Sequence, residues 1–176
     1  MRTAVVTISD RSFRGERPDV SGPVLKTLVE GEGAEVIDEV VVPDDRVLIA
    51  RTLVRLADAR SCELILTTGG TGLSPRDTTP EATRQVIEKE LPGLELALHQ
   101  ESLRHTPFAM LSRAVAGVRG RTLIINFPGS PNAVKECFAV VQPVLSHAVK
   151  LLRDEDPYAI HSQNGEAEHP HVRAAA

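Results

Sequence analysis

The chain has 176 residues, of which 41% are hydrophobic and 25% charged, and its formal net charge is −4. This length predicts one domain with its own core, and the acidic balance argues against nucleic acid as the main partner. Cys62 and Cys137 follow no metal-ligand spacing and favour a reducing compartment over a disulfide scaffold. No apolar stretch reaches membrane-spanning length and no signal-like segment opens the chain, so we expect a cytoplasmic protein without a membrane partner.

The first part of the chain alternates apolar runs with segments of helical periodicity. The expected elements are strands over 3–9, 35–42 and 64–68, and helices over 23–30 and from Asp44-Asp45 onward. The expected apolar face of the second helix consists of Val47, Leu48, Leu53, Leu56 and Ala57. This β-α-β-α-β order is typical of a parallel sheet.

The second part adds three helices and one clear buried strand. A helix is expected to start at Thr79-Pro80-Glu81, where proline and an acid fit the first turn. The further expectations are a helix over 94–104, a turn at 117–120, a strand over 122–126, and a long helix from Ser130-Pro131 that Pro143 kinks or divides. From residue 154 the composition turns polar, and residues 154–176 are expected to form a frayed tail.

The fold class that follows is α/β, with a mostly parallel sheet flanked by helices in three layers. In such sheets the site lies beyond the carboxyl ends of the strands. Polar residues gather after four of the predicted strands, at Ser9-Asp10, Asp44-Asp45, 69–77 and 126–130. We therefore expect one site assembled from these four segments.

The third predicted strand runs into Gly69-Gly70-Thr71-Gly72, the most informative stretch of the chain. Glycine lets the backbone take positive φ and approach a ligand closely, so backbone N–H groups here could cradle a phosphate. The stretch matches neither a P-loop nor a dinucleotide fingerprint, and a tight turn explains a glycine pair about as well. Its place after a buried strand, beside Thr67, Thr68 and Ser74, favours anion binding.

Two acidic residues near these strand ends are candidate ligands of Mg²⁺. Asp77 could instead form a turn or cap before the helix at Thr79, and Asp44 could be the N-cap of its own helix. Two carboxylates from separate strand ends can share Mg²⁺ with phosphates and water, an arrangement that phosphoryl transfer uses. Arg113 is a candidate clamp for phosphate or carboxylate, because its guanidinium is a planar fork.

Taken together, the motifs of the chain closely resemble those of the molybdopterin adenylyltransferases, the MogA/MoaB family that includes the G-domains of gephyrin. The resemblance spans about residues 3–153, in order and without large gaps. The motifs that carry it are TISDR (7–11), DVSGP (19–23), VPDD (42–45), TTGGTGLSPRDTTPEAT (67–83), PGL (92–94), TPFAMLSRAVAGVRG (106–120) and TLIINFPGSPNAVKEC (122–137).

The resemblance implies a three-layer molybdopterin-binding domain over residues 1–153, usually assembled as a homotrimer. It implies transfer of AMP from Mg-ATP to the terminal phosphate of molybdopterin, with release of pyrophosphate and a possible hand-over of the product to a molybdenum insertase. The alternative is a non-catalytic protein that binds and delivers molybdopterin. Because the nucleophile belongs to the substrate, the proposed reaction requires no activated Ser or Cys.

Carried over by position, the resemblance makes Asp44 and Asp77 the catalytic and metal-binding residues. The other residues expected to contact the substrates are Ser9, Asp10, Gly69, Gly70, Thr71, Gly72, Ser74, Ser102, Ser112, Arg113, Asn126, Pro128, Gly129 and Ser130.

Overall fold

The computed structural model describes residues 1–154, so the expected tail lies outside the described residues apart from Asp154. One six-stranded sheet forms the centre of the molecule, in the order β2-β1-β3-β6-β5-β4. The strands are β1 (Arg2–Ile8), β2 (Glu35–Val42), β3 (Leu64–Thr68), β4 (Lys89–Glu90), β5 (Ala116–Arg119) and β6 (Thr122–Phe127). The first four strands of the sheet order are parallel, and β5 and β4 extend it as an antiparallel edge.

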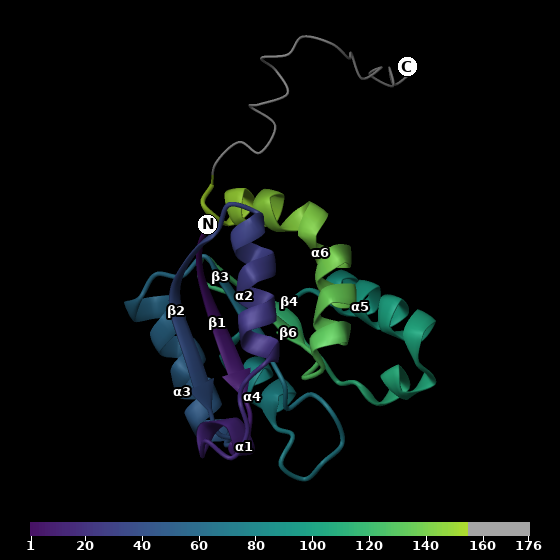
Figure 1. Cartoon of the computed structure of the whole chain (residues 1–176). Coiled ribbons are helices and arrows are strands. Elements are labelled where there is room, and N and C mark those ends of the chain that lie inside the picture. Colours follow the sequence, from purple (N-terminus) through teal and green to yellow (C-terminus); the bar gives the residue numbers. More distant parts are fainter. Residues whose placement is uncertain (155–176) are drawn as a thin grey trace, which may run out of the picture.

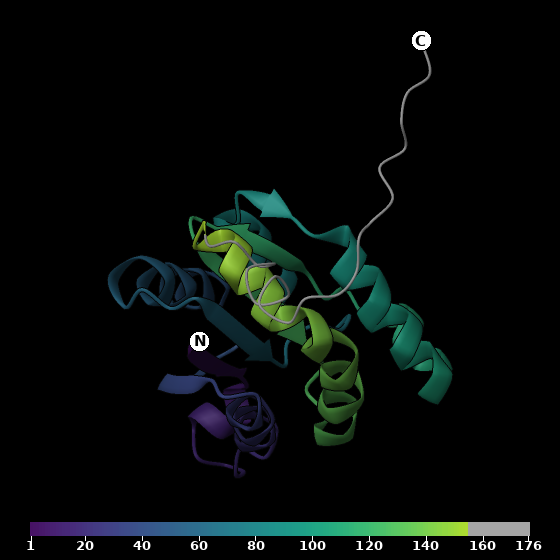
Figure 2. The same ribbon diagram turned by 90° about the horizontal axis from the view of Figure 1, so that it is seen from above.

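Helices cover both faces of the sheet and give the expected three layers (Figures 1 and 2). The helical segments are α1 (Asp10–Phe13), α2 (Ser21–Gly31), α3 (Arg46–Val54), the π-helical turn η1 (Arg55–Ala59), α4 (Thr79–Val86), α5 (Pro92–His105), the 3-10 turn η2 (Pro107–Leu111) and α6 (Pro131–Leu152). No helix in the described part of the chain is both long and apolar enough to span a membrane.

The two faces of the sheet bury separate apolar cores, because alternate residues of a strand point to opposite faces. On β3, Leu64 and Leu66 pack with α2, α5 and α6 on one face, whereas Ile65 packs with α3 and α4 on the other. The central strands are apolar on both faces, as expected for parallel strands covered by helices on both sides. This rigid centre fixes where the strand ends project their polar residues.

The expected buried face of α3 is wrong for the first two of its residues, Val47 and Leu48. Val47 and Leu48 are 56% and 44% exposed, and Ile49 and Ala50 are buried in their place. The reason is the cap: the Asp45 side chain accepts a hydrogen bond of 2.9 Å from the Leu48 N–H and thereby fixes the rotation of the first turn. Leu53, Leu56 and Ala57 are buried as expected.

The edge of the sheet also differs from expectation. The expected turn at 117–120 is mostly strand β5, and only Gly120, with φ +55°, takes a turn conformation. Residue 117 of this strand is a glycine because a Cβ there would come 2.7 Å from the Lys89 carbonyl oxygen on the neighbouring strand. Helix α6 is continuous through Pro143 and bends along its length (Figure 1), so it is kinked and not divided.

Candidate functional site

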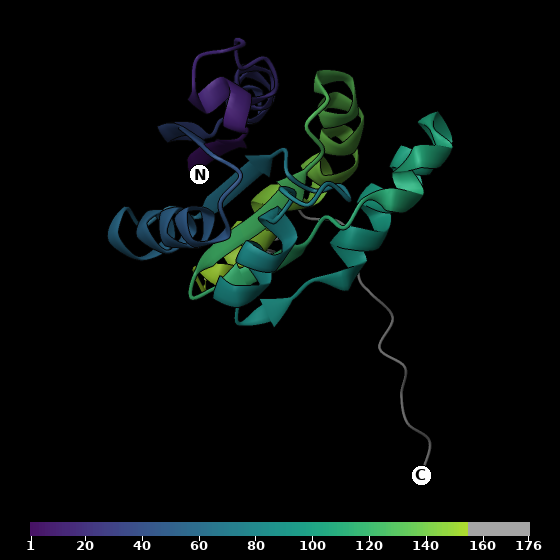
Figure 3. The same cartoon turned by 90° about the horizontal axis from the view of Figure 1, so that it is seen from below.

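A cleft of about 650 Å³ opens at the carboxyl edge of the parallel strands, the edge that Figure 3 faces. It lies beyond β1 and β3, from which the chain departs toward opposite faces of the sheet, so it occupies a topological switch point. The first residues of α2 and α6 also line it, and helix N-termini favour anions. The predicted residues on its wall are Ser9, Asp10, Asp44, Gly69, Gly70, Ser74, Asp77 and Gly129.

The glycine pair allows the backbone to come very close to its neighbours. Gly69 and Gly70 have φ of +100° and +64°, where other residues are strained. A Cβ on Gly69 would overlap the carbonyl oxygen of Ile8, and one on Gly70 would overlap the Thr79 hydroxyl. Thr79 in turn donates a 2.9 Å hydrogen bond to the Gly69 carbonyl. The glycines therefore make a tight turn that lines the cleft, and their contact with an anion stays a prediction.

The Asp44 carboxylate lines the cleft and does not cap its own helix, α3. The cap of α3 is Asp45, and Asp44 instead exchanges two hydrogen bonds with Asp10, one from each backbone N–H to the other carboxylate, at 2.7 and 3.1 Å. Burial, together with the nearby carboxylates of Asp10 and Asp77, raises the pKa of Asp44. A carboxylate that is partly desolvated and repelled by two others is suited to bind a cation.

Arg76 closes one side of this acidic cluster. Its guanidinium donates to both oxygens of Asp10, at 3.0 and 2.9 Å, and these hydrogen bonds hold the pKa of Asp10 below its ordinary value. The bidentate pair joins the end of β1 to the loop after β3. Asp10 is thus occupied by Arg76, whereas Asp44 and Asp77 are not paired with a cation among the described residues.

Asp77 forms a turn and also faces the cleft. One of its carboxylate oxygens, Oδ2, accepts a 2.9 Å hydrogen bond from the Ser74 N–H, and its own N–H donates to the Ser74 carbonyl at 2.8 Å. Within residues 1–154 no group of three or more His, Cys, Asp or Glu side chains is placed to hold a metal ion. Two carboxylates still fit Mg²⁺, which in phosphate sites takes one or two carboxylates and completes its shell with phosphates and water.

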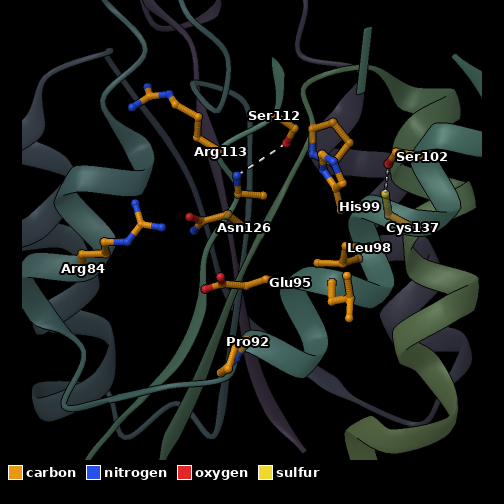
Figure 4. A pocket seen from close by; sticks show the side chains of 13 residues that line it. Arg84, Pro92, Glu95, Leu98, His99, Ser102, Ser112, Arg113, Asn126 and Cys137 are labelled. Atoms are coloured by element: carbon orange, nitrogen blue, oxygen red, sulfur yellow. Dashed lines mark hydrogen bonds between the residues drawn. The ribbon is translucent and has the colours of Figure 1, made fainter. Parts of the chain in front are cut away.

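A second pocket of about 370 Å³ lies on the other side of the Phe127–Gly129 segment, between α5 and the end of β6 (Figure 4). Asn126 and Pro128 line this pocket, whereas Gly129 and Pro131 line the larger cleft. The segment is held by a 2.7 Å hydrogen bond from the Thr68 hydroxyl to the Pro128 carbonyl. A Cβ on Gly129 would come 3.3 Å from the Gly69 Cα, so the segment packs closely against the glycine turn of the larger cleft.

The predicted residues of this second wall divide into two groups. Ser102, Ser112 and Pro128 line the pocket, with the Ser102 hydroxyl 3.2 Å from the buried Cys137 sulfur. Asn126 also lines the pocket, but its amide donates to the Thr67 and Thr83 hydroxyls at 2.9 and 3.0 Å. Its oxygen accepts from the Val115 N–H at 3.2 Å. Its polar atoms therefore serve the protein interior, which speaks against the expected contact with a substrate.

Arg113 is also placed differently from the expected clamp. Arg113 lines the smaller pocket, but its guanidinium extends away from the centre of the pocket in Figure 4. It donates to the carbonyls of Gly72 and Asp77, at 2.9 and 2.7 Å, while pairing with Glu81. Three further predicted residues, Thr71, Gly72 and Ser130, lie on neither wall. For these positions proximity in sequence to a site residue does not imply a place in the site.

On the face of α5 that lines the smaller pocket, sequence reasoning predicted Ser102 but missed Glu95 and His99. Glu95, His99 and Ser102 follow at helical spacing and line the pocket (Figure 4). One Glu95 oxygen accepts a 3.0 Å hydrogen bond from the Ala116 N–H, which orients the carboxylate toward the pocket. Arg84 of α4 faces the same space. The i, i+4, i+7 spacing of Glu95, His99 and Ser102 was the available signal.

Comparison with known proteins gives consistent matches. The family described as the probable molybdopterin binding domain matches residues 4–147. The chain is 47% identical over 154 residues to the molybdenum cofactor synthesis protein cinnamon of Drosophila melanogaster, covering 86% of this chain but only 25% of cinnamon. It is 39% identical over 150 residues to a molybdopterin adenylyltransferase of Helicobacter pylori, covering 84% of this chain and 85% of that protein.

Solved structures agree with these matches. The crystal structure of the molybdopterin biosynthesis enzyme MoaB from Thermus thermophilus superposes with a TM-score of 0.82 at 47% identity, covering 88% of this chain and 97% of that one. A structure of MogA superposes with a TM-score of 0.81 at 38% identity, covering 86% and 99% of the two chains. The sheet and its covering helices are therefore arranged as in these proteins.

Proposed function

Since the chain belongs to the family of the probable molybdopterin binding domain, we propose that it is a molybdopterin adenylyltransferase of molybdenum cofactor biosynthesis. A terminal phosphate oxygen of molybdopterin attacks the α-phosphorus of ATP. The bond from that phosphorus to the bridging oxygen of the β-phosphate breaks, and pyrophosphate leaves. The product is adenylyl-molybdopterin. The name of the bacterial relative that this chain matches over most of its length supports this reaction.

The observation that carries the proposal is the pair of pockets on either side of Phe127–Gly129. A reaction between two phosphorylated molecules needs two binding spaces whose phosphates meet at one point. The larger cleft, with its glycine turn and two helix N-termini, suits the triphosphate of ATP. The smaller pocket, with Glu95 and Ser112 on its wall, suits the pterin, whose ring carries hydrogen-bond donors and acceptors.

Both substrates are negatively charged, and we propose that groups in the larger cleft offset this charge. Asp44 and Asp77 would hold Mg²⁺, which offsets the charge that develops on the phosphates. Backbone N–H groups of the glycine turn other than that of Gly69, which donates to the Phe127 carbonyl at 3.2 Å, would hold the phosphates in place. Burial and the carboxylates of Asp10 and Asp77 raise the pKa of Asp44, and a cation would relieve the repulsion among these carboxylates. No protein nucleophile is needed, so the chain's contribution is binding, orientation and charge.

We also infer a homotrimer, a cytoplasmic location and transfer of the product to a molybdenum insertase. Exposed apolar side chains on α5 and η2 support self-association, with Phe108 and Met110 being 76% and 65% exposed. Cys62 and Cys137 are buried as free thiols, as in proteins of a reducing compartment. Analytical ultracentrifugation should give a trimer, and Met110→Glu should shift it toward the monomer. A wild-type monomer at micromolar concentration would contradict the assembly.

The reaction itself is tested by incubating the protein with molybdopterin and Mg-ATP and measuring pyrophosphate and the AMP adduct. We expect both products in equal amounts, and we expect Asp77→Ala to abolish them while the protein stays folded. Binding of molybdopterin without any adduct would instead identify a delivery protein and overturn the proposal. Unchanged turnover in Asp77→Ala would remove the role given to that carboxylate.

A further inference from the structure

Two of the side-chain nitrogens of Arg113 donate hydrogen bonds to the loop that carries Asp77. Its Nε donates to the Gly72 carbonyl at 2.9 Å, its Nη2 donates to the Asp77 carbonyl at 2.7 Å, and its Nη1 pairs with Glu81. Its backbone N–H donates to the Thr71 carbonyl at 3.0 Å. One residue therefore holds both ends of the loop from Gly72 to Asp77, across more than thirty residues of sequence.

The loop has few other attachments. Its residues from Leu73 to Arg76 are exposed and belong to no helix or strand. Apart from Arg113, its ties are three hydrogen bonds inside the loop, two between Ser74 and Asp77 and one from the Arg76 N–H to the Ser74 hydroxyl, and the bidentate Arg76–Asp10 pair. Thr79 closes the base of the loop by donating to the carbonyls of Gly69 and Gly70. Among the described residues, Arg113 is the one residue outside the loop that bonds Asp77 itself, so the place of Asp77 relative to Asp44 depends directly on it.

We propose that Arg113 is a positioning residue that sets the Asp77 carboxylate opposite Asp44 for metal-dependent AMP transfer, and that it is not a phosphate ligand. The inference rests on the proposed function, and it replaces the clamp expected from the sequence. Its neighbour Ser112 lines the smaller pocket. Through two consecutive residues, the wall of the pterin pocket is thus joined to the loop of the nucleotide cleft.

The chemistry of the residue explains why arginine stands at this position. The planar guanidinium presents N–H groups in three fixed directions, which here meet two carbonyls and one carboxylate. Glu81, in the first turn of α4, fixes the plane of the guanidinium and neutralises its charge. A lysine carries a single ammonium group on a flexible stem and cannot satisfy the same three acceptors in this geometry.

The test compares Arg113→Lys with the wild type and with Arg104→Lys, a control at a side chain that is 77% exposed and lies on neither pocket wall. We expect kcat of Arg113→Lys to fall by about 10- to 100-fold, because an ångström of misplacement in a site costs up to about 100-fold. The KM values for ATP and molybdopterin should change less than about threefold, as for an interaction made only in the transition state. A phosphate ligand would instead raise KM.

Hydrogen–deuterium exchange gives a second readout that does not depend on activity. We expect amides over 72–79, including those of Ser74, Asp77 and Thr79, to exchange at least tenfold faster in Arg113→Lys than in Arg104→Lys. Equal exchange in the two variants would overturn the proposal, as would a rise in KM with kcat unchanged. If the wild type forms no adduct, the proposed function fails, and faster exchange in this loop still shows that Arg113 places Asp77.

Discussion

Replacing Asn126 by alanine should cost stability more than it costs substrate binding. The Asn126 side chain is fully buried and makes three hydrogen bonds, to Thr67, Thr83 and the Val115 N–H. The variant leaves the buried Val115 N–H without the side-chain oxygen to which it donates, at a cost of about 1–3 kcal/mol. Loss of the bonds to the two threonines adds about 0.5–1.5 kcal/mol each. The expected loss of about 2–6 kcal/mol is a large part of a typical stability of about 5–15 kcal/mol.

Urea unfolding followed by far-UV circular dichroism measures this loss, since the chain has no tryptophan for fluorescence. The protomer concentration must be held constant, because self-association contributes to apparent stability. Ser112→Ala is the matched control: it lies on the same pocket wall, but among residues 1–154 its hydroxyl accepts only one hydrogen bond, of 3.4 Å. Its cost should stay below about 1 kcal/mol. A cost below about 1 kcal/mol for Asn126→Ala, combined with a raised KM for molybdopterin, would refute the reasoning and make Asn126 a substrate ligand.

Three further substitutions test the site. Gly70→Ala forces a left-handed backbone on alanine and displaces Thr79, so urea unfolding should show a loss of about 2 kcal/mol or more and the KM for ATP should rise. Asp44→Asn should abolish AMP transfer yet raise the urea midpoint near neutral pH. The pKa of Asp44 is raised by burial, so wild-type stability is lost as pH rises through that pKa, and the gain should vanish below the ordinary pKa of about 4. Glu95→Gln should raise the KM for molybdopterin by about 10-fold or more, by loss of charge-assisted hydrogen bonds, and leave the KM for ATP unchanged.

The parallel half of the sheet was predictable because its signals are local. The apolar run Leu64–Leu66 is buried on both faces, and such runs are recognisable without knowledge of their neighbours. The two-residue strand β4 has no such signal, because Lys89 and Glu90 are exposed and polar. Their strand conformation comes from pairing with β5, nearly thirty residues away. The start of α3 depended on which of two adjacent aspartates caps the helix, a choice that sequence leaves open.

The larger cleft followed from the sequence, whereas the roles of several polar residues did not. Polar residues after parallel strands meet at one edge of the sheet, which placed Asp44, Asp77 and the glycine turn together. Arg113 and Asn126 have side chains equally able to bind a ligand or to brace a fold. Their partners at Glu81 and Thr83 are brought to them only by the tertiary structure. The chemistry of a side chain therefore suggested binding where the fold uses it for support.

The position of Phe127–Gly129 between the two pockets has a consequence for how the product leaves. Adenylyl-molybdopterin joins the occupants of both pockets in one molecule, so once one half is bound the other half faces its own pocket at a high effective concentration. In the proposed reaction, such a bivalent ligand should be held more tightly than either substrate, and its release should be slow. Retention by two pockets therefore opposes loss of the product to solution.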